Sequence, residues 1–214
     1  SLTDDAQFGV LIHLVNAQYY LSRQPNALVV GPQGTQLVYI YASGWVFGQW
    51  IGDGFGGAAA APLADAPLWA QMNDQSWPSG IGGIVQATGE GWAQLMEDYA
   101  LAVMLNGTTA PPPEHPFTSY DFPSAIELWC FAADHPPCEG SDPGPTGSFP
   151  WTVTTHVDGE TVVPSRSFAS ASYSGTSGPG GIRIHEFVSN GTGAGTEVHA
   201  EGPAPLRMVV VRIN

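Results

Sequence analysis

The sequence contains no lysine, and charged residues make up only 11% of it. Five arginines stand against 19 Asp and Glu residues, which gives a formal net charge of −14 at pH 7. Binding to nucleic acid requires a cluster of basic side chains that displaces counterions from the phosphates. Anionic membrane surfaces attract the same kind of basic cluster. So few basic residues cannot assemble one, and the composition therefore excludes nucleic acid as a partner.

Long hydrophobic runs are also missing. Spanning a bilayer as a helix takes about 18 or more consecutive apolar residues, and no stretch approaches that length. The chain opens with Ser1-Leu2-Thr3, without Met and without an apolar signal segment. We therefore expect no transmembrane segment, and we interpret Ser1 as the start of a processed or trimmed chain.

Cysteine is scarce, and its two copies lie close together. Cys130 and Cys138 enclose a short loop with a Pro-Pro pair, which a disulfide would close. A Cys/His metal site is the alternative, because His135 lies between them, but two cysteines and one histidine do not complete a tetrahedral site. We predict the disulfide. Because disulfides persist in oxidising compartments, we expect the protein to be extracytoplasmic, either periplasmic or secreted.

The strongest pattern that is present predicts a helix over residues 88–108. Its apolar residues recur with the spacing of a helix that has one buried face: Trp92, Leu95, Met96, Tyr99, Ala100, Val103 and Met104. Thr88 is expected to cap its start, and Asn106-Gly107 to supply the left-handed residue that ends it. We interpret this segment as a central packing helix.

Other patterns divide the chain into a helical part and a part rich in strands. Helices are predicted over about residues 3–23, 35–51 and 67–74, and a Pro/Gly-rich linker over 109–149. From residue 150 the hydrophobic period becomes two, and Asp158-Gly159 predicts a hairpin. Further strands are expected over 167–173, 181–188, 195–200 and 206–213. The predicted fold class is α+β, with a helical subdomain (1–108), the linker, and an antiparallel β-sandwich-like module (150–214).

Glycines recur every four residues in the predicted helix 35–51 and directly after it, at Gly44, Gly48 and Gly52. They leave a flat face that another backbone can approach closely. With the neighbouring Tyr41 and Trp45, they form our candidate interaction surface. The glycine-rich residues 52–57 lack the preceding strand and the Lys-Ser/Thr of a phosphate loop, so a helix-breaking role accounts for them.

No pattern predicts a catalytic residue, a metal ligand set or a cofactor. His185-Glu186 begins like a zinc-protease motif, but position 189 is Ser and the segment alternates like a strand. His156 and His199 could meet across a sheet. The adjacent acids Glu97 and Asp98 could form half of an acid/base pair, although carboxylates on the exposed flank of a helix are more common.

Three stretches resemble a known family. They are residues 37–56, with the sequence LVYIYASGWVFGQWIGDGFG, residues 81–89 (IGGIVQATG) and residues 92–108 (WAQLMEDYALAVMLNGT). They are similar to the helical region downstream of the zinc site in secreted bacterial metallopeptidases of the hyicolysin type. There, a helix ending near Phe-Gly precedes a Thr-Gly turn and a helix ending in Asn-Gly-Thr. Residues 182–187 and 206–213 resemble the β-rich module that follows.

The family's His-Glu-x-x-His motif has no counterpart in this sequence, so no catalytic residue can be transferred. Our hypothesis is a non-catalytic structural, accessory or binding protein that acts on a protein partner or larger assembly. One alternative is the C-terminal fragment of a processed zinc metallopeptidase whose catalytic segment lies upstream. Another is a carbohydrate-binding module that uses exposed Trp and Tyr.

Overall fold

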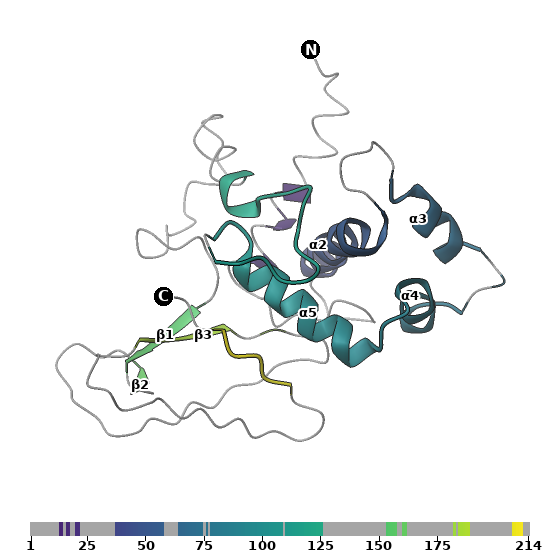
Figure 1. Cartoon of the computed structure of the whole chain (residues 1–214). Helices are drawn as coiled ribbons and strands as arrows, with labels where there is room; N and C mark the ends of the chain where they lie inside the picture. Colours follow the sequence, from purple (N-terminus) through teal and green to yellow (C-terminus); the bar gives the residue numbers. More distant parts are fainter. Residues whose placement is uncertain are drawn as a thin grey trace, which may run out of the picture.

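The structure is a computed structural model. It describes residues 13, 14, 16, 17, 20, 21, 37–57, 64–74, 76, 78–108, 110–125, 153–157, 160, 161, 182, 184–188 and 207–211. Its named elements are four helices, α2 (Leu37–Phe55), α3 (Ala66–Met72), α4 (Ile81–Thr88) and α5 (Trp92–Leu105), and three short strands, β1 (Val153–Val157), β2 (Glu160–Thr161) and β3 (Ile184–Val188). In Figure 1, α3 and α4 lie on one side of α2 and α5, and the strands lie on the other.

The predicted central helix is present as α5, which spans Trp92–Leu105 rather than the predicted 88–108. It packs against α2 and buries the side chains that the periodicity selects, among them Leu95, Tyr99 and Val103. Gly107, with a φ of +73°, supplies the left-handed residue just beyond its end, as expected. Thr88 does not cap its start. That residue ends α4, where its hydroxyl donates a hydrogen bond to the Ile84 carbonyl at 2.9 Å.

The remaining helix predictions differ in accuracy. The short helix predicted over 67–74 is present as α3, and α2 runs four residues beyond the predicted end at 51. The first predicted helix lies largely outside the described residues, although residues 13, 14, 16, 17, 20 and 21 are helical. Helix α4 was not predicted, because its Gly82-Gly83 pair indicates a turn.

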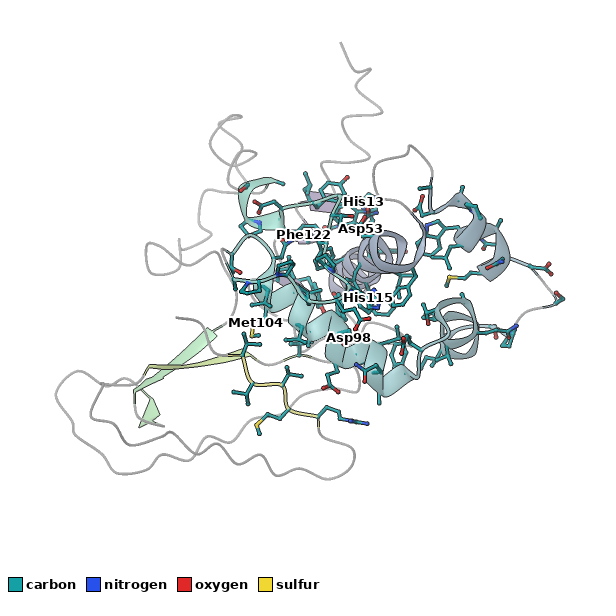
Figure 2. The ribbon with its side chains drawn as sticks, in the orientation of Figure 1. His13, Asp53, Asp98, Met104, His115 and Phe122 are labelled. Atoms are coloured by element: carbon teal, nitrogen blue, oxygen red, sulfur yellow. The ribbon has the colours of Figure 1, made fainter. Side chains whose placement is uncertain are left out.

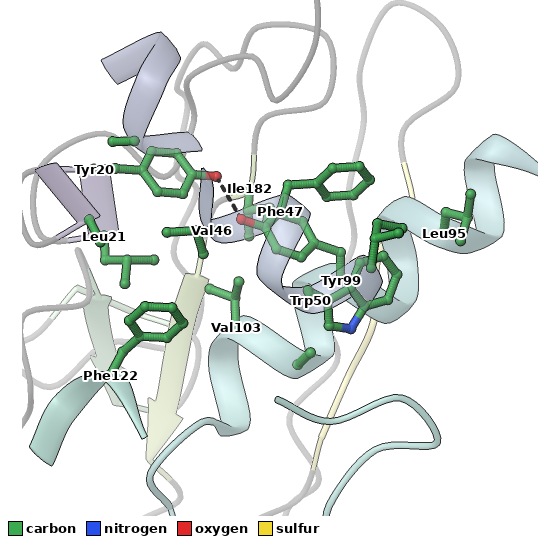
Figure 3. Packing of buried hydrophobic residues seen from close by; sticks show 14 of the residues in the cluster. Tyr20, Leu21, Val46, Phe47, Trp50, Leu95, Tyr99, Val103, Phe122 and Ile182 are labelled. Atoms are coloured by element: carbon green, nitrogen blue, oxygen red, sulfur yellow. Dashed lines mark hydrogen bonds between the residues drawn. The ribbon is translucent and has the colours of Figure 1, made fainter. Parts of the chain in front are cut away.

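The core is formed where α2 and α5 meet, with contributions from distant segments. Figure 3 shows Trp50, Phe47 and Tyr99 packed together at the centre, with Tyr20 and Ile182 beside them. The buried apolar residues whose side chains are described come from the N-terminal helical residues, from α2–α5 and from two later positions: Leu14, Ala17, Tyr20, Leu21, Ala42, Val46, Phe47, Trp50, Ile51, Leu68, Ile84, Leu95, Tyr99, Ala102, Val103, Leu105, Phe122 and Ile182.

The predicted β-sandwich is wrong. The described part of the chain is mainly helical, and its strands form one three-stranded sheet in the order β2-β1-β3. β1 and β2 pair as an antiparallel hairpin, but β1 and β3 pair in parallel. A parallel pair needs a long crossover connection rather than a tight turn, so period-two patterns alone did not indicate it.

The last predicted strand, 206–213, is also wrong where it is described. Residues 207–211 do not belong to a strand, and the side chains of Met208 and Val210 are 47% and 69% exposed. Arg207 anchors this segment to α5 through an ion pair with Glu97, at 3.7 Å between Nη1 and Oε2. Residues 207–211 therefore lie near α5, and the side chains of Met208 and Val210 extend into solvent.

Candidate functional site

The structure separates the five residues of the candidate interaction surface into an open pair and a covered set. Tyr41 is 63% exposed and Gly44 is exposed next to it, with no atom within 4 Å of where its Cβ would be. Gly48 and Gly52 face the chain's own Trp69 and Asp65. The glycine face therefore serves internal packing at its C-terminal half and is open only at its N-terminal half.

Trp45, the fifth of these residues, is half-buried in an aromatic cluster. The His13 ring stacks on its indole with centroids 5.3 Å apart, and the rings of Tyr120 and Phe122 meet it edge-on. Nδ1 of His13 is buried and makes no hydrogen bond. His13 is therefore a packing residue, and its buried Nδ1 is an exception to the rule that buried polar atoms are hydrogen-bonded.

The most connected polar group near α2 is the Asp53 carboxylate, which sequence reasoning missed. Its Oδ2 accepts hydrogen bonds from the backbone N–H groups of Thr118 and Ser119, both at 2.9 Å, and its Oδ1 accepts one from the Ser119 hydroxyl. Asp53 is labelled in Figure 2, close to the C-terminal end of α2. The partners lie 65 and 66 residues away, so no local signal marks Asp53 as the anchor of residues 118–119.

A second set of contacts, made by Trp50 and Phe55, holds the same segment on α2. The indole N–H of Trp50 donates to the backbone carbonyl of His115 at 2.7 Å, and the His115 ring packs on Phe55 with centroids 4.3 Å apart. Asp53 and Trp50 together fix residues 115–119 across α2. The indole N–H of Trp50 and both carboxylate oxygens of Asp53 have partners within the chain, so we interpret these contacts as structural.

The end of α2 does not resemble a phosphate site. The carboxylate of Asp65 lies against Gly52, and the indole N–H of Trp69 donates to this carboxylate at 2.6 Å. A negative charge beside the glycines repels a phosphate group. This arrangement agrees with the sequence interpretation, in which the glycines of residues 52–57 end the helix.

Glu97 and Asp98 point to different partners. Glu97 pairs with Arg207, and Asp98 accepts a hydrogen bond from the Gln94 amide at 2.9 Å. Burial raises the pKa of Asp98, and the hydrogen bond from Gln94 and the charge of His115 oppose this rise. The two acids therefore do not act as a pair. Within the described ranges, no group of three or more His, Cys, Asp or Glu side chains could hold a metal ion.

Two buried tyrosines form the other notable polar contact. The Tyr99 hydroxyl donates to the Tyr20 hydroxyl at 3.4 Å, linking α5 to the N-terminal helical residues (Figure 3). Both side chains are fully buried. Burial raises the pKa of Tyr20 to about 12 and the pKa of Tyr99 well above its ordinary value, because a phenolate would lose its hydration in the core.

We expect the free energy of unfolding to fall above pH 10 by about 1.4 kcal/mol per pH unit for each of these tyrosines. A tyrosine in the unfolded chain ionises near pH 10, whereas the folded core keeps both phenols protonated. The contribution of the two protonated tyrosines to the free energy of unfolding is therefore complete below pH 10. It is lost as the pH rises from there toward the pKa values of the folded state. Urea unfolding followed by circular dichroism between pH 9 and pH 11.5 measures the slope.

The double variant Tyr20→Phe/Tyr99→Phe should have a shallower loss of stability over this pH range. Tyr41→Phe, which changes an exposed tyrosine, is the matched control and should behave like the unaltered chain. An equally steep loss in the double variant would show that other groups cause the alkaline unfolding.

Several expectations lie outside the described residues. The predicted disulfide between Cys130 and Cys138, His135 between them, and His199 all belong to this set. None of the helices in the described part of the chain is long and apolar enough to cross a membrane. Comparison with known proteins identifies no relative: no family model matches the sequence, and no curated protein or solved structure matches it.

Proposed function

We propose that this chain is a non-catalytic, extracytoplasmic structural or accessory subunit that binds a protein partner or larger assembly. The observation that carries this proposal is that the acids nearest the helical core are engaged by the fold. Asp53 holds residues 118–119, Glu97 pairs with Arg207, and Asp98 accepts from Gln94. Asp53 and Glu97 fix distant segments on α2 and α5, as a scaffold requires, whereas the Asp98–Gln94 hydrogen bond lies within α5.

The open end of the glycine face on α2 is the part of this scaffold best suited to a partner. Tyr41 exposes most of a large amphipathic side chain, and aromatic residues of this kind are enriched at protein interfaces. Gly44 lies one turn further along the same helix with open space above it, so a partner backbone can approach closely. The segment between Gly48 and the end of α2 is covered by α3 and the residues before it.

Site-specific photo-crosslinking tests the binding part of this proposal. A crosslinking amino acid replaces Tyr41 in the native cell, and a second variant carries it at the exposed residue Asp74, away from α2. A protein adduct formed from position 41 and not from position 74 supports the proposal. The absence of any adduct from position 41 would contradict a docking role for this end of α2.

An activity assay tests the non-catalytic part. The purified chain should not cleave casein, with or without added zinc. Cleavage that a chelator abolishes and zinc restores would overturn the proposal, because it would require a metal-dependent active site in this chain. A mock purification from cells that do not express the chain serves as a control for contaminating protease.

The second candidate is the C-terminal portion of a secreted zinc metallopeptidase, whose zinc-binding segment lies upstream. One observation favours it. Helix α2 ends at Phe55, directly before Gly56, and α4 ends at Thr88, directly before Gly89. Helix α5 ends directly before the sequence Asn-Gly-Thr at residues 106–108. In the hyicolysin-type pattern, one helix ends near Phe-Gly, a turn follows at Thr-Gly, and a later helix ends in Asn-Gly-Thr. The coding sequence upstream of Ser1 distinguishes the candidates: a His-Glu-x-x-His motif there would favour the peptidase.

A further inference from the structure

The chain that follows α5 contains three consecutive prolines, Pro111, Pro112 and Pro113. Each proline ring fixes φ near −65°, and it also restricts the residue before it to extended conformations. Two of the three prolines precede another proline, so both restrictions act on them together. The structure has neither a helix nor a strand over residues 111–113. These residues therefore form a short polyproline II segment, a left-handed helix without internal hydrogen bonds.

The polyproline segment is open to solvent. Pro111, Pro112 and the following Glu114 are exposed, whereas Pro113 is half-buried. Within the described part of the chain, the carbonyl groups of residues 111–113 accept no hydrogen bond. The segment therefore offers two proline rings and a row of carbonyl acceptors that a partner can contact.

Contacts on both sides of the prolines hold the segment in place without covering it. The Asn106 amide donates to the Tyr120 carbonyl at 2.9 Å and accepts from the Phe122 N–H at 2.8 Å, which closes the loop that contains the prolines. On the other side, the indole N–H of Trp50 holds the carbonyl of His115 (labelled in Figure 2) at 2.7 Å. A segment that is fixed in advance loses little conformational entropy when a partner binds it.

The charge beside the prolines selects the kind of partner. Glu114 is exposed, and both Glu114 and Glu90 act electrostatically on Asp98, so three carboxylates lie near this end of the segment. The whole chain has a formal net charge of −14. A complementary surface therefore carries basic side chains at the position that meets Glu114.

We propose that residues 111–114 are a docking site for a protein domain with an aromatic-lined groove that has a basic side chain at one end. Proline-rich segments in the polyproline II conformation bind grooves of this kind. The aromatic rings of the groove pack on the rings of Pro111 and Pro112, its polar donors bind the free carbonyls, and its basic group pairs with Glu114. This site shares no residue with the Tyr41 end of α2, and each of the two surfaces can bind without the other.

Competition with a synthetic polyproline peptide tests the proposal. The full chain is immobilised, incubated with an extract of its native cells and eluted with this peptide, which adopts the same conformation. We expect a protein that the polyproline peptide elutes and a Gly/Ser peptide of equal length does not. In calorimetry with that purified protein, Pro112→Ala should weaken binding by roughly tenfold, because it removes a packed ring and the fixed φ. Glu114→Gln should weaken binding less and reduce its dependence on salt.

Two further variants separate this site from other causes of weaker binding. Pro67→Ala changes an exposed proline at the start of α3 and should bind like the unaltered chain. Tyr41→Ala should also leave this affinity unchanged, so a failure at the Tyr41 surface does not affect the result. The proposal is overturned if the polyproline peptide elutes no protein, if Pro112→Ala binds as tightly as the unaltered chain, or if Pro67→Ala weakens binding equally. In each of those cases, the prolines serve only as a stiff connector.

Discussion

Replacing Trp50 with alanine is expected to lower the free energy of unfolding by about 3–5 kcal/mol, the usual cost of truncating a large buried aromatic residue. Trp50 is 0% exposed, and its ring lies within 5.7 Å, between centroids, of the rings of Phe47, Phe55 and Tyr99. The change would leave a cavity between α2 and α5. It would also leave the part-buried carbonyl of His115 without its hydrogen-bond donor.

Urea unfolding followed by circular dichroism measures this loss, and two variants identify its cause. Trp50→Phe keeps an aromatic ring but removes the N–H group, so it should cost less than Trp50→Ala and still more than a surface change. Tyr41→Ala removes an exposed ring from the same helix and should change stability by about 0.5 kcal/mol or less. Similar losses in Trp50→Ala and Tyr41→Ala would contradict the assignment of Trp50 to the core.

The helices show what a single sequence specifies locally. The periodicity of residues 88–108 identifies both α5 and its buried face, because the spacing of Leu95, Tyr99 and Val103 depends only on helix geometry. Helix α4 escapes such reasoning, because Gly82 and Gly83 are poor helix formers. Its packing explains Gly83: a Cβ there would overlap the Pro78 carbonyl oxygen, so only glycine allows the chain to approach this closely.

The β region shows where local patterns stop being informative. The sequence contains the hairpin signal Asp158-Gly159, and the strands on both sides of it are present. It contains no signal that β3 pairs with β1 in parallel, because this register depends on contacts between segments that are separated by many residues. The apolar sequence of residues 208–211 is compatible with two structures. It fits a buried strand, and it fits equally well an extended segment held near α5 by the ion pair between Arg207 and Glu97.

The contacts of the candidate site were the least predictable part. Asp53 lies in a glycine-rich stretch that suggests only a helix end, yet its carboxylate receives hydrogen bonds from residues 118–119. Its role depends on where a proline-rich segment returns to α2, which is a tertiary contact. The packing at Gly48 and Gly52 is also a tertiary contact. The spacing of these glycines indicates that something packs closely against them, but it does not indicate that Trp69 and Asp65 do so.

Replacing Gly56 with alanine is expected to destabilise the protein by about 1–3 kcal/mol, the typical cost of forcing extra volume into a packed site. A Cβ at this position would overlap Cβ of Asp65 and would lie only 2.5 Å from the Gly52 carbonyl oxygen and 2.7 Å from Cα of Asp65. Two of these three atoms belong to the backbone, so a side-chain rotation cannot relieve the clash. The residues before α3 would have to move away from the end of α2.

The same substitution at Gly44 provides the matched control with the opposite sign. Gly44 lies within α2 with no atom within 4 Å of the added Cβ, and alanine is more favourable than glycine inside a helix by about 0.8–1.0 kcal/mol. Gly44→Ala should therefore raise the urea midpoint, whereas Gly56→Ala should lower it. Equal midpoints for the two variants would contradict the close packing of α3 on α2. If Gly44→Ala also prevents the crosslinking expected from position 41 while raising stability, the space above Gly44 is part of the partner's binding surface rather than unused surface.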